Sequence, residues 1–139
     1  MNEFYAVLMS WAVMLSGYDA PLQQAEVVVV PHHYLMKAAC HGSECKVLGW
    51  FPPGHRIFLD SRLNPQDSLY ASSILVHEMV HYLQYTSGKY GRTYSCEAII
   101  EMEREAYRIQ SEFLVRYGVY QPVGLSMHSI GCETLAHRE

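Results

Sequence analysis

The sequence predicts a single α+β domain in which a small sheet precedes two long helices. Short apolar or alternating runs, separated by Gly and Pro, fill residues 26–60 and are typical of strands. Two later segments, 69–87 and 96–117, contain neither Gly nor Pro and are long enough for extended helices. Half of the 139 residues are apolar and 17% are charged, which suits one compact hydrophobic core. We therefore expect residues 1–139 to form one domain.

The chain begins with an apolar segment that we interpret as an amphipathic helix over residues 3–16, ended by Gly17. Its apolar part, residues 4–15, is too short to span a bilayer. A signal peptide is the alternative interpretation. However, Glu3 precedes the segment and no basic residue accompanies it, which favours a helix that packs on the domain.

The middle of the chain is predicted to supply the sheet. The run 26–30 contains four consecutive Val and predicts a buried strand, and Pro31 is suited to open a helix that continues to about Ala39. Residues 46–51 and 56–60 then predict two strands on either side of the turn Pro52-Pro53-Gly54-His55. The sheet is therefore expected to be small, and either antiparallel or mixed.

Two long helices are predicted to follow. The first begins near residue 69 and ends before Gly88. The second extends from Cys96 to Tyr117, with Ser95 as its N-cap and Gly118 as its stop. We expect these helices to carry the chemistry of the protein, because each contains potential metal ligands.

The pentad His77-Glu78-Met79-Val80-His81 predicts a zinc site and a catalytic base on the first of these helices. Residues four apart lie on one helix face, so His77 and His81 can offer two imidazoles to one ion. Glu78 is offset by roughly 100°, which places its carboxylate beside the metal. There it can deprotonate a water that the metal activates.

A third protein ligand is expected from the second helix, because a catalytic zinc has three protein ligands and one open position. Glu103 falls within the predicted inward stripe of that helix, where an unpaired carboxylate is costly unless it binds metal. Glu101 and Glu105 lie further from the centre of the stripe. We therefore predict Glu103 as the third ligand. The stripe consists of Ile99, Ala106, Phe113 and Leu114.

The pentad together with Glu103-Arg104-Glu105-Ala106-Tyr107 resembles the gluzincin branch of zinc metallopeptidases, over residues of about 70 to 117. The resemblance implies a zincin-like fold, in which the sheet packs on the HExxH helix and a following helix supplies a glutamate ligand. The Glu-x-Glu-Ala pattern is similar to that of minimal gluzincin domains, whose first Glu is the ligand. The fixed nineteen-residue gap found in larger thermolysin-like enzymes selects Glu101 instead.

The same resemblance implies further roles. Gln84 matches the HExxHxxQ variant of such small domains, whereas Tyr107 stands where those domains usually have a supporting Asp or Asn. The strand nearest the metal would bind an extended substrate, and the candidate for this strand is 56–60. A purely structural hairpin is the alternative. Related enzymes stabilise the oxyanion with a Tyr or His from the C-terminal part. The candidates here are Tyr117, Tyr120 and His128.

Together these features predict a zinc-dependent metallopeptidase with one Zn²⁺ per chain and Glu78 as general base, acting on a peptide or protein substrate. Two alternatives remain open at this stage. The domain could be a metal-binding regulatory module with weak or no activity, or a zinc hydrolase of a non-protein amide. The intact Glu78 argues against the first, because a dead site has no need of a base.

The charge and the cysteines bear on partners and compartment. The net charge of −4 and the absence of a Lys/Arg cluster give no reason to expect a nucleic-acid partner, and no segment is long enough for a membrane span. Four cysteines permit two disulfides, of which Cys40–Cys45 and Cys96–Cys132 are the most economical pairing. If oxidised, these pairs favour an exported location, whereas buried reduced thiols in a cytosolic protein are the alternative.

Overall fold

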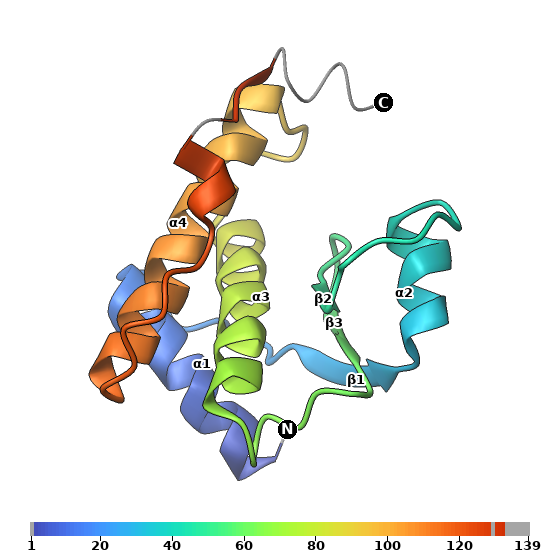
Figure 1. Ribbon diagram of the computed structural model, residues 1–139. Helices are drawn as coiled ribbons and strands as arrows, with labels where there is room; N and C mark the ends of the chain where they lie inside the picture. The colour runs from blue at the N-terminus through green and yellow to red at the C-terminus, as the bar shows by residue number, and fades with distance from the viewer. Residues whose placement is uncertain (1, 129, 133–139) are drawn as a thin grey trace.

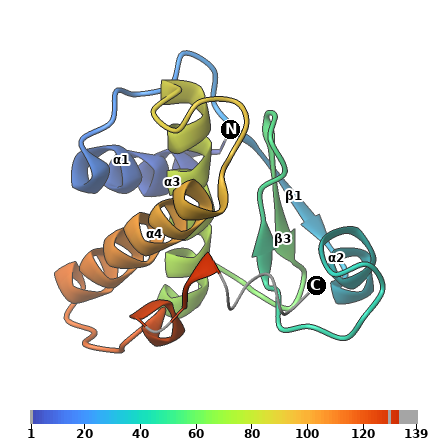
Figure 2. The same cartoon turned by 90° about the horizontal axis from the view of Figure 1, so that it is seen from above.

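The computed structural model describes residues 2–128 and 130–132, and its elements form three layers (Figures 1 and 2). Three helices lie on one side of a small sheet, and one short helix lies on the other. The elements are α1 (Glu3–Ser16), β1 (Glu26–Val30), α2 (His32–Ala39), β2 (Gly49–Trp50), β3 (Arg56–Asp60), α3 (Leu69–Ser87), α4 (Cys96–Arg116) and the 3₁₀ helix η1 (Leu125–His128). The α+β class and the order of elements follow the prediction.

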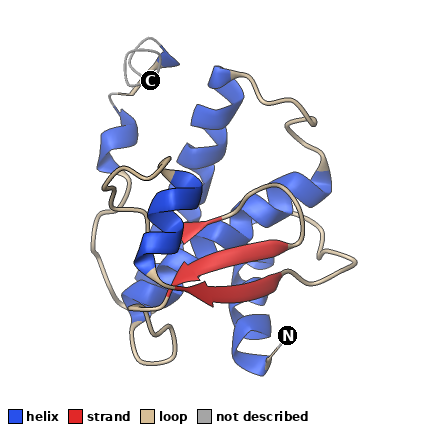
Figure 3. Cartoon of the chain, turned by 90° about the vertical axis from the view of Figure 1, so that its right-hand side faces the viewer, coloured by secondary structure: helices blue, strands red, loops and turns tan. Residues whose placement is uncertain are grey.

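The sheet is mixed, with strand order β1-β3-β2 (Figure 3). β1 pairs in parallel with β3, and β2 pairs antiparallel with β3. The predicted strand 46–51 is paired only at Gly49 and Trp50, because Pro52 and Pro53 follow it and have no N–H to donate. β3 lies in the middle of the sheet and is paired on both sides, so the prediction that a substrate pairs with residues 56–60 is wrong. The edge strand that contacts α3 is β2.

α3 is the central helix, packed against α1, α4 and the sheet (Figure 1). It begins where the Ser68 side chain accepts a hydrogen bond from the Ala71 N–H, and it ends at Gly88 in the left-handed conformation. From Ala71 to Gln84 nearly every residue is buried, which is typical of a helix enclosed on all sides. His77 and Glu78 therefore sit in the interior of the molecule.

α4 is amphipathic and covers α3 on the side away from the sheet. Ser95 caps it, as predicted, by accepting from the Ala98 N–H. The predicted stripe was partly wrong, since Ile99 is 44% exposed and Ile100 is buried in its place. Ala106, Phe113 and Leu114 are buried as predicted, so the inward face is confirmed beyond the first turn, and Met102 and Ile109 extend it.

The remaining helices flank this pair. α1 buries Leu8, Met9 and Ala12 against α3 and α4, so the N-terminal segment packs on the domain. α2 begins one residue after Pro31, which is the N-cap and not the first helical residue. Among the described residues, no helix combines the length and the hydropathy that crossing a membrane requires.

Both predicted disulfides are present, Cys40–Cys45 and Cys96–Cys132. The first closes the loop that leads into β2. The second joins the start of α4 to the C-terminal segment, which returns along α4 and packs η1 against it. Two disulfides and no described free cysteine suggest an oxidising, exported environment.

Candidate metal centre

The packing of α3 on α4 brings His77, His81 and Glu103 together. The two Nε2 atoms of the histidines lie 3.2 Å apart, and His77 Nε2 lies 3.6 Å from Glu103 Oε2. The other carboxylate oxygen of Glu103 contacts His81 Nε2. One potential ligand atom from each residue lies within 4.8 Å of the others, so the three form a group that could hold a metal ion.

A buried amide fixes the orientation of His77. The Nδ1–H of His77 donates to Gln110 Oε1 at 3.0 Å, and Gln110 Nε2 donates to Ser73 Oγ at 3.1 Å. The Ser73 hydroxyl donates its own hydrogen to the Tyr70 carbonyl, so its oxygen must accept from Gln110. The amide oxygen therefore faces His77, and the imidazole carries its hydrogen on Nδ1.

A second buried amide fixes His81 in the same way. The Nδ1–H of His81 donates to Gln84 Oε1 at 2.8 Å. Gln84 Nε2 donates to the Met102 carbonyl and to Glu105 Oε1, neither of which has a hydrogen to give. Gln84 therefore has only one orientation, and Nδ1 of His81 is also the protonated nitrogen.

The consequence is a donor set that fits a cation. With Nδ1 protonated in both rings, the two Nε2 lone pairs point at each other and at a carboxylate, which is unfavourable unless a proton or a metal ion lies between them. Two nitrogen ligands at about 2.0–2.1 Å from a tetrahedral zinc are about 3.3 Å apart. The observed separation of 3.2 Å agrees with this value. Histidine ligands whose Nδ1–H is held by a polar partner are the usual arrangement at zinc sites.

The electrostatics of the group point the same way. Burial lowers the pKa of His81, but the hydrogen bond with Glu103 and the charges of Glu78 and Glu103 outweigh it and raise the pKa to about 9. For Glu103, burial raises the pKa, and the hydrogen bonds from His77 and His81 more than reverse this and lower it. A positive charge between these atoms is therefore favourable.

Glu78 lies beside this group and lines the same cleft. Its side chain accepts no hydrogen bond from the described residues, although only 8% of the residue is exposed. Burial raises the pKa of this carboxyl, and the nearby His77 and His81 offset the increase only in part. A carboxyl whose pKa is raised by burial and which lines a cleft beside potential metal ligands is a candidate functional group.

Gly49 of β2 allows the sheet to approach Glu78. A Cβ at this position would lie 2.9 Å from Glu78 Cγ and 3.2 Å from its Oε2, which is closer than normal contacts. Only glycine therefore fits between the strand and the carboxylate without displacing one of them. The strand consequently helps to hold Glu78 at its place beside the histidines.

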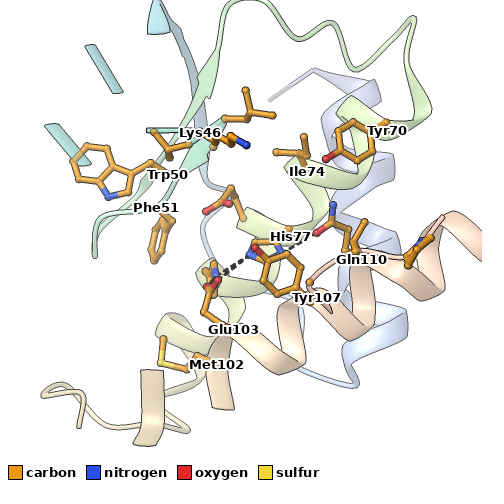
Figure 4. Close-up of a pocket in the computed structure, with 18 of the residues that line it drawn as sticks. Lys46, Trp50, Phe51, Tyr70, Ile74, His77, Met102, Glu103, Tyr107 and Gln110 are labelled. Carbon is orange, nitrogen blue, oxygen red and sulfur yellow. Dashed lines mark hydrogen bonds and ion pairs between the residues drawn. The ribbon is translucent and has the colours of Figure 1, made fainter. Parts of the chain in front are cut away.

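The group opens into a cleft of about 690 Å³ between the α3–α4 pair and the β2 segment (Figure 4). Most of the lining residues are apolar or aromatic. Apart from Lys46, the charged and amide side chains lie around His77, His81 and Glu103, which we call the ligand group. Such a concave, mostly apolar pocket with a few convergent polar groups is typical of ligand-binding sites. The aromatic residues of the lining are Trp50, Phe51, Tyr70, Tyr94 and Tyr107.

The structure excludes the alternative glutamates from this group. Glu101 is exposed on the surface of α4. Glu105 accepts hydrogen bonds from Tyr18 and Gln84 and pairs with Lys89, so its carboxylate is engaged behind His81. Of the three glutamates, Glu103 is the one that meets both histidines.

The two tyrosines predicted as stabilisers of an oxyanion are not among the described residues that line the cleft. Tyr117 accepts a hydrogen bond from Trp11 Nε1 on the far side of α4, and Tyr120 is 79% exposed. The side chain of His128 lies outside the described part of the structure. Both tyrosines follow the end of α4, and the chain reaches the cleft only after them, at Pro122, Val123 and Gly124.

The aromatic residue nearest the ligands is Tyr107, whose ring lies edge-on to His77 with centroids 4.4 Å apart. Gly124 closes over it, since a Cβ there would lie 2.3 Å from Tyr107 Cγ. Burial and the charges of Glu103 and Glu78 raise the pKa of Tyr107, so its hydroxyl keeps its hydrogen. Tyr107 is thus a hydrogen-bond donor in the cleft wall.

Two important residues were missed in the sequence. Gln110 follows Glu103 by seven residues, which is two helical turns, so the shared helix face was a usable signal. Gly49 had no usable signal, because its role depends on a contact between segments far apart in the chain. Gln84 was noticed only through the family resemblance.

No protein-family model matches this chain, and no curated protein or solved structure matches it significantly.

Proposed function

We propose that this protein is a zinc-dependent metallopeptidase of the gluzincin type, with His77, His81 and Glu103 as ligands and Glu78 as general base. The observation that carries the proposal is the pair of His Nε2 lone pairs that converge on the Glu103 carboxylate. Two buried amides fix them there, and Glu78 lines the same cleft. Two His and one carboxylate favour zinc over harder cations.

Bound zinc would supply a Lewis acid that acidifies a water and polarises the scissile carbonyl. Glu78 accepts a proton from the attacking water and returns it to the leaving amine, because its carboxylate lines the cleft beside the ligands. Gln110 and Gln84 keep the two imidazoles in the ligating tautomer throughout. The apolar cleft walls exclude bulk water around the reacting groups.

In this proposal Tyr107 replaces the C-terminal residues as the donor to the developing oxyanion. It lines the cleft next to His77, and its hydroxyl keeps its hydrogen. Tyr107→Phe should lower kcat by about 10- to 100-fold and leave KM and zinc content unchanged. An unchanged kcat would remove Tyr107 from the mechanism and leave the metal and the base in place.

We infer that β2 is the edge that faces the substrate. It is the edge strand of the sheet, and it contacts α3 and lines the cleft. An extended substrate can add to such an edge by main-chain pairing. The segment 46–50 is therefore the proposed substrate strand.

Metal content tests the first half of the proposal. Plasma mass spectrometry of the purified protein should find about one zinc per chain. Glu103→Ala should lose it, and the matched variant Glu101→Ala should keep it, since Glu101 is exposed on the same helix. No stoichiometric metal after zinc is supplied, or equal loss in both variants, would contradict the site.

Product analysis on peptide mixtures tests the second half. Glu78→Gln should retain zinc and lower turnover by at least about 100-fold, because it removes the base and keeps the shape. If the native protein holds zinc and cleaves neither peptides nor simple amides, the site is a binding or regulatory module. If it cleaves only non-peptide amides, the chemistry stands and the substrate class changes.

A further inference from the structure

The metal cleft is chemically different at its two ends (Figure 4). On one side of the ligand group the lining is apolar, with Phe51 and Met102. On the other side lies Lys46, the only Lys or Arg among the described residues that line the cleft. The substrate that fills the cleft therefore meets an apolar surface on one side of the reacting bond and a positive charge on the other.

Lys46 is placed to contact a ligand. Its side chain is exposed and forms no ion pair with any described residue, so its charge is unmatched within that part of the chain. Figure 4 shows Lys46 and Tyr70 extending toward each other from opposite walls, with Ile74 between them. Tyr70 comes from the first turn of α3 and lines the same cleft. An ammonium and a phenol above an apolar floor are suited to a carboxylate.

The backbone around Lys46 is held in place on both sides. Cys45, the residue before it, is bonded to Cys40. Two residues after it, the Leu48 carbonyl accepts a hydrogen bond from the Asp60 N–H at 2.9 Å, and β2 begins at Gly49. Because the main chain is fixed, binding a ligand costs mainly the ordering of the Lys46 side chain.

We propose that Lys46 and Tyr70 form a carboxylate-binding subsite, so that the preferred substrate carries an anionic carboxylate on the Lys46 side of the scissile bond. This inference rests on the proposed function, because the subsite belongs to the same cleft. A chain-terminal carboxylate and an acidic side chain both supply the required group. In the first case the protein removes residues from C-termini, and in the second it cleaves beside Asp or Glu.

Binding to a protein that cannot turn over tests the subsite directly. Calorimetry on zinc-loaded Glu78→Gln would compare acetyl-Phe-Leu-Ala as the free acid and as the amide. We expect the acid to bind about tenfold more tightly, because one charge-assisted contact in a partly enclosed cleft contributes about that much. The preference should weaken in high salt.

The decisive variant is Lys46→Met in the same background, which keeps the length of the side chain and removes the charge. It should reduce the acid-to-amide ratio to within about twofold. Lys46→Arg should preserve the ratio, and so should Lys37→Met, which changes an exposed lysine of α2 outside the cleft. If the acid-to-amide ratio is unchanged in Lys46→Met, the metal and not Lys46 binds the carboxylate, and the proposal is overturned. Equal binding of acid and amide to the protein that retains Lys46 also overturns it.

A second peptide pair separates the two sources of the carboxylate. Acetyl-Phe-Leu-Glu amide and acetyl-Phe-Leu-Gln amide differ only in a side-chain charge. A Lys46-dependent preference in the first pair alone identifies a C-terminal carboxylate, and a preference in the second pair alone identifies an acidic side chain. If the preference is found but the native protein cleaves no peptide, the proposed peptidase fails and the subsite stands.

Discussion

The two walls of the cleft are built in different ways. The helical wall of α3 and α4 carries the ligand group, and its supporting polar side chains, Gln84 and Gln110, are almost fully buried. The opposite wall, residues 46–51, has only two residues in a strand and is partly exposed along its length. The comparison indicates that the atoms that must be placed accurately lie where packing fixes them. The atoms that we propose to meet the substrate lie on a segment that is attached at a few points.

The largest difference between the walls should appear in stability. Leu75→Ala on α3 should lower the free energy of unfolding by about 3 kcal/mol, because Leu75 is fully enclosed in the core. Leu48→Ala in the opposite wall should cost about 1 kcal/mol or less, since Leu48 is only partly buried. Urea unfolding with the disulfides intact measures both values. Equal losses would show that the two walls are equally well packed.

The next difference concerns metal affinity. Gln110→Met should weaken zinc binding about 10- to 100-fold, because it removes the acceptor for His77 and leaves Ser73 without its donor. Gln121→Met, which changes an exposed glutamine away from the site, should have no effect. Competition with a chromophoric chelator gives both affinities. Unchanged binding in Gln110→Met would mean that the amide does not position the ligand.

The contact between the walls should be sensitive to a single methyl group. Gly49→Ala should lower kcat about tenfold and leave zinc content unchanged, because the added Cβ would displace the Glu78 carboxylate. Gly131→Ala is the control, as a Cβ there meets no atom within 4 Å. Full activity in Gly49→Ala would show that the β2 segment moves to accommodate the methyl group and that the Glu78 carboxylate keeps its position.

The smallest expected effect depends on pH and lies in the sheet. Hydrogen bonds from Arg62 lower the pKa of Asp60 from 3.8 to about 2, against the opposing effect of burial. The lower pKa in the folded state contributes stability above about pH 4, and this contribution is lost as the pH falls toward 2. Asp60→Asn should therefore destabilise the protein by about 1 kcal/mol at pH 7, since the exposed Arg62 charge is screened.

The difference between the native protein and Asp60→Asn should shrink as the pH falls from 4 to 2. Unfolding curves across this range provide the measurement. A difference that stays constant with pH would assign the effect to lost packing and not to the charge.

The helical elements were more predictable than the sheet. Ser95 begins α4 and Gly88 ends α3, both by local chemistry that is visible in the sequence. The helical periodicity of the HExxH segment places its two histidines on one face. The short extent of β2 and the central position of β3 depend on pairing between distant segments. Periodicity alone contains no information about such pairing.

The site shows the same division. The group of His77, His81 and Glu103 could be assembled from helical spacing and from the cost of burying a carboxylate. Tyr107 was assigned only to a position where families carry a supporting carboxylate, and the structure places its ring against His77 while Gln110 supplies the support. That exchange depends on which side chain of this shared α4 face reaches the Nδ1 atom of His77, and helical spacing alone does not determine it.

The two glutamines that hold the histidines have a consequence for the conditions in which the protein can work. Many metal sites orient their histidines with carboxylates, which lose the required charge when they are protonated in acid. An amide has no proton to gain in that range, so Gln84 and Gln110 accept the same hydrogen bonds at every pH at which the chain is folded. In the oxidising, exported environment that the two disulfides suggest, the hydrogen bonds that orient His77 and His81 therefore do not depend on the pH of the surroundings.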